Sequence, residues 1–511
     1  MYTREQVRAL TDRIFNMVTG ADAVQVEVDA GEQSGTRWAN SSITTNLVRY
    51  DREVTITVRV GGRQGSASTM DFGDAGLQGA IDEAIAEARG ERGEEGAGEE
   101  AGGRGGGGEA GGRGGGGRAG ARGGRGGGDV GGGAGGAGGG GGGGDVGGGG
   151  AGRGGGEPPE WLGPQSYIEV DAVLPSGVSF GPGERALMVK ESLDISDEMG
   201  VVGSGYIPKN YRTTCTANTN GLFAFYSFAE TGFVLTCRTP DGAGSGWAGI
   251  TGIKDVNDID AAALTRTAAN KALMSVNPRA IEPGRYTVIL EPRANARFLS
   301  LMTNIFNARN VEEGNSFLSG EEEGSTKIGE KVFSDLFTLR SDIGNPILRQ
   351  TPILNDLTPA APVTWVEDGV LRNLDIDDAL ARERGAEPTP ANVNMSLVME
   401  GGEQSIEDII ATTQRGLLVT FFWYIRGVDQ ETLLNTGMTR DGLFLIENGE
   451  IVGPVQNFRW NMSPLVGYNN LTAVGRAGPM HMGESYDGGN TGLIPPVRIE
   501  DFYMTSVSPA V

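Results

Sequence analysis

Hydrophobic and polar residues follow two different periods along the first ninety positions of the chain. Residues 4–18 and 77–88 carry apolar side chains three and four positions apart, which predicts two amphipathic helices. Thr3 and Gln6 have the spacing of a capping box at the start of the first helix. Residues 23–28 and 54–60 alternate apolar and polar residues, as half-buried strands do. Gly61-Gly62 then predicts a hairpin turn into a strand at 64–68.

The middle of the chain repeats these patterns. Residues 221–226 and 233–237 are predicted to be two strands, and residues 261–274 a helix. A turn at 282–284 leads into a strand at 286–290, which feeds a helix of about residues 294–307. We therefore expect a strand-to-helix step near residue 292.

Turn signals divide the last 140 residues. Three sites, 367–369, 440–442 and 447–449, have an Asp-Gly or Asn-Gly pair between apolar runs and predict hairpins. One helix is expected among them, because Ser405 and Asp408 have capping-box spacing before Ile406, Ile409 and Ile410. The rest is predicted to be mainly antiparallel sheet.

These elements predict an α+β fold of two domains. The N-terminal α+β domain is expected in two parts, residues 1–89 and 157–282, followed by a mainly antiparallel-β C-terminal domain at 283–511. Residues 90–156 are nearly all glycine, with no side chains to offset the entropy of ordering the backbone, so we expect a disordered insertion or linker. A translated GC-rich stretch is an alternative origin.

Charge and hydropathy limit the binding partners and the cellular location that the sequence supports. The formal net charge of −24 disfavours nucleic-acid binding, which relies on clustered Lys and Arg. No apolar run is long enough to span a bilayer, and the N-terminus lacks a secretion signal, so a cytoplasmic protein is expected. Cys215 and Cys237 are then expected to be reduced, buried thiols.

Few residues offer catalytic chemistry. His481 is the single histidine, so the nitrogen and sulfur ligands of a zinc site are scarce. A dyad of Cys215 with His481 is one reading. The alternative is that both cysteines are small buried hydrophobes and that His481 is a loop or interface residue. Acidic residues could bind Mg²⁺ or hydrolyse glycosides, although such runs usually form solvated faces. The residues concerned are Glu312, Glu313, Glu321, Glu322, Glu323, Asp375, Asp377 and Asp378.

Three segments of the C-terminal part, 416–426, 433–442 and 444–452, closely resemble the C-terminal domain of the TldD/PmbA family, also called modulators of DNA gyrase. Further matching segments are 398–402, 313–317, 37–43 and 61–65. The resemblance covers nearly the whole chain apart from the glycine-rich tract. It implies the two-domain fold of that family.

In that family, one type of subunit is a zinc peptidase with an HExxxH motif on the helix after a strand like 286–290. Aligned on Val288, Ile289, Leu290 and Pro292, the two histidines and the glutamate fall at Ser300, Ile305 and Leu301. These side chains cannot hold zinc or accept a proton. The other type of subunit, TldE or PmbA, lacks the motif and assembles with the first as a heterodimer.

The resemblance therefore implies a non-catalytic, TldE-like subunit of a heterodimeric zinc metallopeptidase acting on peptides. We expect no cofactor in this chain, zinc in a TldD-like partner, and an extended peptide as substrate. The run Phe421-Phe422-Trp423-Tyr424, with Arg426, is a candidate interface or peptide-cavity surface. Alternatives are a stand-alone peptide-binding or regulatory protein without hydrolytic activity and, less favoured, a carboxylate-based hydrolase.

Overall fold

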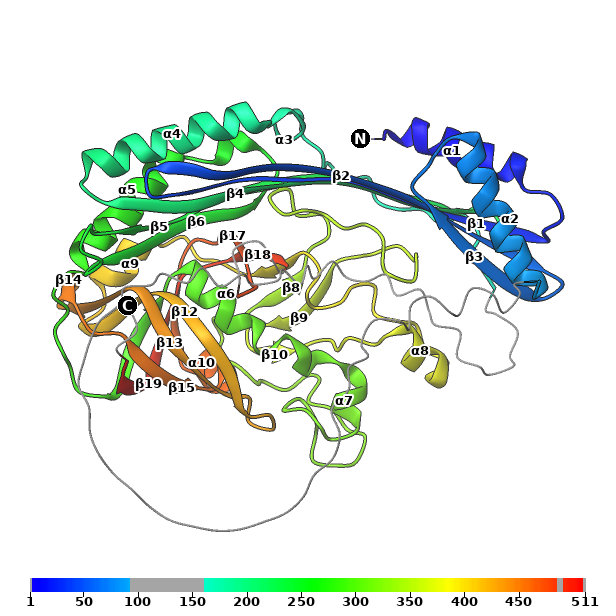
Figure 1. Cartoon of the computed structure of the whole chain (residues 1–511). Helices are drawn as coiled ribbons and strands as arrows, with labels where there is room; N and C mark the ends of the chain where they lie inside the picture. The colour runs from blue at the N-terminus through cyan, green and yellow to red at the C-terminus, as the bar shows by residue number, and fades with distance from the viewer. Residues whose placement is uncertain (1, 92–159, 485–489, 509–511) are drawn as a thin grey trace, which may run out of the picture.

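The computed structural model describes residues 2–91, 160–484 and 490–508, which form two domains (Figure 1). The N-terminal domain combines a long sheet with helices, and the C-terminal domain is rich in strands, so the predicted α+β class is confirmed. The prediction of a disordered tract falls almost entirely outside the described residues. In the described ranges, no helix is both long and apolar enough to cross a membrane.

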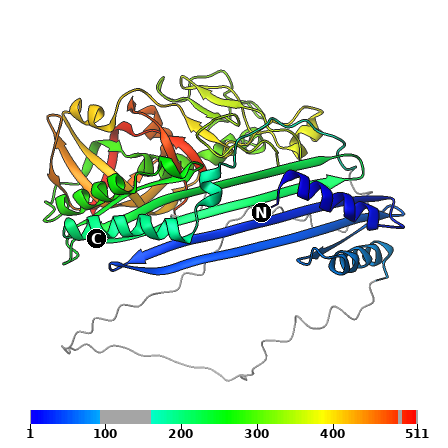
Figure 2. The same cartoon turned by 90° about the horizontal axis from the view of Figure 1, so that it is seen from above.

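The N-terminal domain is built on an antiparallel sheet with the strand order β3-β2-β1-β4-β5-β6 (Figure 2). Its strands are β1 (Ala23–Ala39), β2 (Ser42–Val60), β3 (Arg63–Thr69), β4 (Val202–Asn218), β5 (Phe223–Arg238) and β6 (Ser245–Ile253). The predicted segments 23–28 and 54–60 are only one end of β1 and β2. With 19 residues, β2 is about 60 Å long at the usual rise per residue.

The two strands predicted at 221–226 and 233–237 are one continuous strand, so that prediction was wrong. Glu230 and Thr231, between them, still pair with Asn210 and Lys209 of β4. The irregularity there is a β-bulge against β6 and not a turn. A sequence pattern cannot distinguish a bulged strand from two strands, because both interrupt the alternation of apolar residues.

Helices cover one face of this sheet at its two ends (Figure 1). The helices are α1 (Arg4–Met17), α2 (Asp74–Arg89), α3 (Pro175–Ser179), α4 (Pro182–Glu198) and α5 (Ala261–Met274), and η2 (Val256–Asp258) is a short 3₁₀ helix. The predicted helices at 4–18, 77–88 and 261–274 are confirmed, as is the capping box of Thr3 and Gln6. A Cβ at Gly65 would lie 2.2 Å from the carbonyl oxygen of Ala84, so glycine allows α2 to pack directly on β3.

Five strands of the C-terminal domain close into a barrel, because β12 pairs with both β7 and β13 at the two ends of the order β12-β7-β19-β15-β13. These strands are β7 (Gly284–Leu290), β12 (Arg415–Asp429), β13 (Leu434–Glu447), β15 (Phe458–Met462) and β19 (Val497–Val507), flanked by β14 (Glu450–Pro454) and β16 (Leu471–Val474). Val288 and Leu290 belong to the main core, whereas Ile289 faces a separate cluster with Ile409.

A second sheet has the order β10-β9-β8-β11-β18-β17. Its strands are β8 (Leu339–Ser341), β9 (Val363–Glu367), β10 (Val370–Leu371), β11 (Leu397–Met399), β17 (Gly478–His481) and β18 (Thr491–Ile494). The helices are α6 (Pro292–Ser300), η3 (Thr303–Phe306), α7 (Ala308–Glu312), α8 (Asp378–Arg384), α9 (Ile406–Ala411) and α10 (Pro464–Asn469). The single helix predicted in the last 140 residues is α9, with its capping box, but α8 and α10 also occur there. Both are short, so they leave little periodic signal.

Two of the three predicted hairpin turns are confirmed. Asp368-Gly369 joins β9 to β10, and Asn448-Gly449 joins β13 to β14, with all four residues in the left-handed region. The turn predicted at Arg440-Asp441-Gly442 is wrong, because these residues lie inside β13. Asp441 and Gly442 have φ of 55° and 124° and form a bulge opposite β12.

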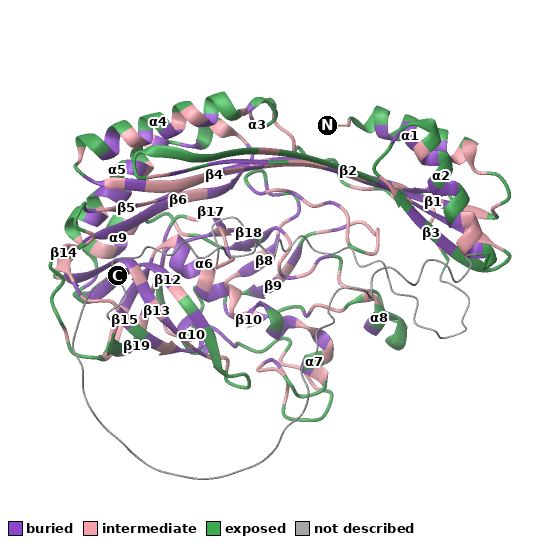
Figure 3. Ribbon diagram, viewed as in Figure 1, coloured by how far each residue is buried: buried purple, intermediate pink, exposed green. Residues whose placement is uncertain are grey.

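The two domains share a hydrophobic core. Val234 of β5 and Trp247 of β6 point away from the helices of the N-terminal domain and belong to the core of the C-terminal domain. Phe233 and Ala248, their neighbours in sequence, point to the helices instead. The sheet is therefore packed on both faces at this end, with α4 and α5 on one side and the C-terminal domain on the other (Figure 3).

Candidate functional site

The positions at which the family resemblance places a zinc motif begin with the last residue of helix α6 and continue into the 3₁₀ helix η3. Helix α6 begins directly after β7, with Glu291 as N-cap and Pro292 in its first turn, and it ends at Ser300. The helix predicted at about 294–307 is therefore confirmed over 294–300, and its continuation to 307 is wrong. Leu301 and Met302 donate i→i−3 hydrogen bonds to Phe298 and Leu299, which tighten the end of α6 before the 3₁₀ helix η3 begins.

The three motif positions offer no metal ligands. The Ser300 hydroxyl donates a 2.8 Å hydrogen bond to the carbonyl of Arg297 and accepts one of 3.2 Å from its guanidinium. Leu301 packs against the main core, and Ile305 is buried in it. Because α6 stops at Ser300, the three side chains do not project from one helix. A hydroxyl and two aliphatic groups in this arrangement do not fit a zinc ion.

Two arginines of α6 bind the chain segment that ends β17. Arg293 donates to the carbonyls of His481 and Gly483 at 2.5 and 2.8 Å, and Arg297 donates to the carbonyl of Met482 at 2.8 Å. Burial lowers the pKa of Arg297, and Glu484 opposes this shift. We call this set of contacts the arginine clamp. It holds residues 481–484 on α6, and no sequence signal other than the four-residue spacing of the arginines indicated it.

The aromatic run of β12 lies next to the clamp and is split between three environments. Phe422 is in the barrel, with ring centroids 4.8 Å from Trp460 and 5.7 Å from Phe502. Phe421 is on the other face of the strand, 5.8 Å from Trp247 of the N-terminal domain. Both rings are fully buried.

Trp423 is half-buried, and Arg440 lies over its ring at 5.1 Å. Tyr424 is 48% exposed in a left-handed conformation with φ of 54°, and Arg426 lies 4.3 Å from its ring centre. The Tyr424 amide donates to the carboxylate of Glu484 at 3.2 Å, next to the clamped segment. Tyr424 and Arg426 are thus the members of the run that a partner or peptide can reach, and their role stays a prediction.

The cysteine and histidine residues do not form a nucleophile system. Cys215 lies in the core beneath α1 and α2, and burial raises its pKa to about 12. Cys237 is in the other core of that domain, with its pKa raised by burial to about 11. Both thiols are free, as expected.

His481 is part of strand β17, so the loop reading is wrong, and His481 lies where the C-terminal domain contacts β6 of the N-terminal domain. Its Nδ1 lies 2.9 Å from the Thr491 hydroxyl, its amide donates to Thr251, and burial lowers its pKa. The strand was missed because it is only four residues long and contains a proline.

The acidic residues are mostly dispersed. Glu321, Glu322 and Glu323 are exposed, as expected for a solvated face. Glu312 pairs with Arg384, and Asp377 caps α8. Burial, and secondarily Asp377, raises the pKa of Asp375 to about 6. In the described part of the chain, His, Cys, Asp and Glu side chains form no group of three or more that could hold a metal ion.

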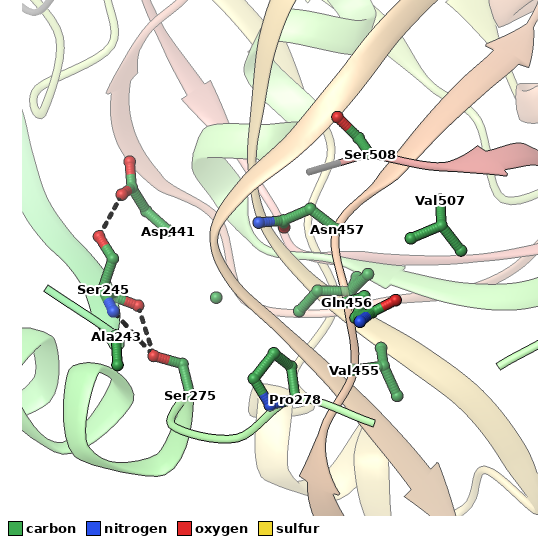
Figure 4. A pocket seen from close by; sticks show the side chains of 12 residues that line it. Ala243, Ser245, Ser275, Pro278, Asp441, Val455, Gln456, Asn457, Val507 and Ser508 are labelled. Atoms are coloured by element: carbon green, nitrogen blue, oxygen red, sulfur yellow. Dashed lines mark hydrogen bonds between the residues drawn. The ribbon is translucent and has the colours of Figure 1, made fainter. Parts of the chain in front are cut away.

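A pocket of about 340 Å³ with a mixed polar and apolar lining lies at the boundary between the two domains (Figure 4). Ser245 of β6 donates a 2.5 Å hydrogen bond to the buried carboxylate of Asp441 in β13, and the Ser275 hydroxyl bridges the backbone of Ser245. The left-handed bulge of Asp441 places its carboxylate at this contact. The hydrogen bond between Ser245 and Asp441 therefore connects the two domains at the wall of this pocket.

Two family profiles match the sequence. The PmbA/TldA metallopeptidase C-terminal domain matches residues 283–506, and PmbA/TldA metallopeptidase domain 1 matches residues 24–88, together more than half of the chain. This chain belongs to the PmbA/TldD family. Among curated proteins, none matches it.

Three solved structures share the PmbA/TldD fold. A Thermotoga maritima protein described as a modulator of a DNA gyrase has a TM-score of 0.71 and 17% identity over 97% of this chain and 99% of its own. TldE from Thermococcus kodakarensis has a TM-score of 0.69 and 16% identity over 98% and 100%. A Bacteroides thetaiotaomicron protein described as a modulator of DNA gyrase has a TM-score of 0.68 and 18% identity over 99% and 100%. At these identities the likeness concerns the fold of the PmbA/TldD proteins.

Proposed function

We propose that this chain is the non-catalytic, TldE-like subunit of a heterodimeric TldD/TldE-type zinc metallopeptidase that cleaves peptides and partly unfolded proteins. The observation that carries the proposal is the chemistry of three residues at the end of α6 and just beyond it. Ser300, Leu301 and Ile305 offer no metal donor where the family resemblance expects two histidines and a glutamate. The arginine clamp holds the neighbouring residues 481–484 on the same helix.

Zinc and the catalytic glutamate belong to a TldD-like partner in this proposal, and no cofactor belongs to this chain. This subunit contributes an interface to the partner, helps to enclose the catalytic cavity of the complex, and offers a sheet edge with which an extended peptide can pair. Tyr424 and Arg426 are the proposed contacts, because they are exposed at the end of the aromatic run. We propose that the complex works in the cytoplasm, with no role in binding nucleic acid or membranes.

The test is a peptidase assay with the full chain, a TldD-like protein that carries HExxxH, and zinc. Cleavage of an unstructured fluorogenic peptide should require both proteins and should stop with a chelator. Replacing the motif glutamate of the partner by glutamine should abolish cleavage, whereas Ser300→Ala in this chain should leave it unchanged. Chelator-sensitive cleavage by this chain alone would refute the proposal.

The same materials separate this proposal from a stand-alone peptide-binding or regulatory protein. Size-exclusion chromatography of the co-expressed pair should show one complex that contains both chains and zinc. Two separate peaks, with peptide bound by this chain alone, would favour the stand-alone function.

A further inference from the structure

The carboxylate of Glu484 lies against strand β12, next to a backbone donor and two basic side chains. The backbone N–H of Tyr424 donates to its Oε1 at 3.2 Å, and the guanidinium of Arg426 is 3.9 Å from its Oε2. Burial lowers the pKa of Arg297 on α6 and the charge of Glu484 opposes this shift, so Arg297 is also near. We call the Tyr424 N–H and the Arg426 guanidinium the carboxylate site. The site is locally basic, although the chain has a net charge of −24.

An irregularity in β12 makes the Tyr424 N–H available. In the pairing with β13, residues 424 and 425 together face Gly437, one residue more than a regular ladder contains. This β-bulge holds Tyr424 in the left-handed region, with φ of 54°. On the other side of β12, strand β7 pairs only with Leu417–Val419. The N–H of Tyr424 therefore donates to Glu484 and not to a neighbouring strand, and strained residues of this kind are concentrated at functional sites.

Glu484 fills the carboxylate site imperfectly. At 3.9 Å the Arg426 guanidinium is too far from the carboxylate for a hydrogen bond, and it donates to the carbonyl of Ile425 instead. The backbone of Glu484 is itself held, because Arg293 donates to its carbonyl at 3.2 Å. The Glu484 carboxylate can therefore move only as far as its side chain allows. A carboxylate on a separate molecule has no such tether and can approach both donors at ordinary hydrogen-bond distances.

The carboxylate site is open to solvent. The side chains of Arg426 and Glu484 are 56% and 34% exposed, and Tyr424 is exposed beside them. An ion pair with this exposure contributes little to the stability of a protein, because water and salt screen it. Displacement of Glu484 from the site by another carboxylate therefore costs little.

We propose that the carboxylate site binds a carboxylate group of an extended peptide, and that Glu484 occupies the site in the free chain as an internal competitor. Backbone N–H groups and arginine side chains are common partners of a peptide C-terminus. An acidic side chain of the peptide presents the same chemistry. The inference rests on the proposed function for the peptide itself, and it adds which group of the peptide this chain holds.

The test measures peptide binding to the full chain alone by fluorescence anisotropy. Three otherwise uncharged peptides carry a neutral dye at the N-terminus: one ends in a free carboxylate, one ends in an amide, and one ends in an amide and contains an internal glutamate. Glu484→Ala removes the competitor and should bind the free-acid peptide about fivefold more tightly than the wild type does, with no gain for the uncharged amide. Adding Arg426→Gln to Glu484→Ala should abolish the gain. A gain for the glutamate peptide would show that the site also accepts a side-chain carboxylate.

The control is Glu400→Ala, which breaks a different exposed ion pair, with Arg340, and should bind all three peptides as the wild type does. Circular dichroism should show that each variant is folded. An equal gain for the uncharged amide, the same gain in Glu400→Ala, or no binding of the free-acid peptide by Glu484→Ala would overturn the inference. The two-chain cleavage assay does not depend on these results, so the proposed function stands or fails separately.

Discussion

Lys271 of α5 and Glu291 at the start of α6 form an ion pair of 2.7 Å across the boundary between the two domains. Both side chains are largely buried, at 14% and 13% exposure. Lys271 also donates to the carbonyl of Trp247, and the hydroxyl of Thr420 donates to Glu291. Glu291, the N-cap of α6, is thus held to the N-terminal domain by this ion pair. Both charged groups of the pair also have a further hydrogen-bond partner.

Removing one member of this ion pair should destabilise the folded protein. We expect Lys271→Met to lower the free energy of unfolding by about 3 kcal/mol, because Glu291 would remain as a largely buried charge without its partner. Urea denaturation followed by tryptophan fluorescence measures the change. The control is Lys190→Met, which breaks the exposed pair with Asp194 and should cost less than about 0.5 kcal/mol. Equal losses in both variants would contradict the role of the pair.

The arginine clamp should determine the mobility of residues 481–484. Arg293→Met removes hydrogen bonds from a charged donor, each worth about 1.5 kcal/mol or more, so we expect amide hydrogen exchange at 482–484 to rise at least about tenfold. Arg297→Met should act in the same direction. Arg309→Met, which breaks an exposed pair with Glu383, serves as the control. Unchanged exchange in the first variant would show that β17 is held by other contacts.

Asp375 should make stability depend on pH. Its pKa of about 6 lies above the ordinary value near 3.9, so folding favours the protonated form. The stabilisation is complete below about pH 4 and is lost as the pH rises through about 6. Asp375→Asn keeps a neutral side chain and should therefore gain about 2 kcal/mol over the wild type between pH 4 and pH 7. Glu321→Gln, an exposed control, should show no such change, and a pH-independent difference for Asp375→Asn would contradict the burial of this carboxyl.

Restoring the motif residues should not restore a metal site. The triple variant Ser300→His, Leu301→Glu, Ile305→His supplies the ligands, but α6 ends at Ser300 and position 305 is buried in η3. We expect no stoichiometric zinc after dialysis, measured by atomic absorption and by competition with a chromophoric chelator. The single variant Ser300→His is the control. One tightly bound zinc per triple-variant chain would show that the end of α6 adapts to the metal.

Local patterns in the sequence predicted the elements that local interactions stabilise. The capping box of Thr3, the helix at 261–274 and the turn at Gly61-Gly62 depend on residues within a few positions of each other. Closure of the barrel, by contrast, joins residues 284–290 to 415–429 and 497–507. Such pairings leave no periodic signal, and the same limitation made β5 look like two strands.

The candidate site was predictable in its chemistry but not in its geometry. The residues at 300, 301 and 305 can be read directly and exclude metal ligation by those side chains. The end of α6 at Ser300 depends on hydrogen bonds that a helical pattern does not reveal. The arginine clamp joins residues 188 positions apart, so only the folded chain brings Arg293 to His481.

The continuous strands of the N-terminal sheet have a mechanical consequence. The core under α1 and α2 and the core under α4 and α5 lie at opposite ends of the same strands, of which β1 and β4 run unbroken from one core to the other (Figure 1). Their separation can change only if the strands themselves bend or twist. The two ends of the sheet are thus mechanically coupled through these strands, so that a force applied at one end is transmitted to the other.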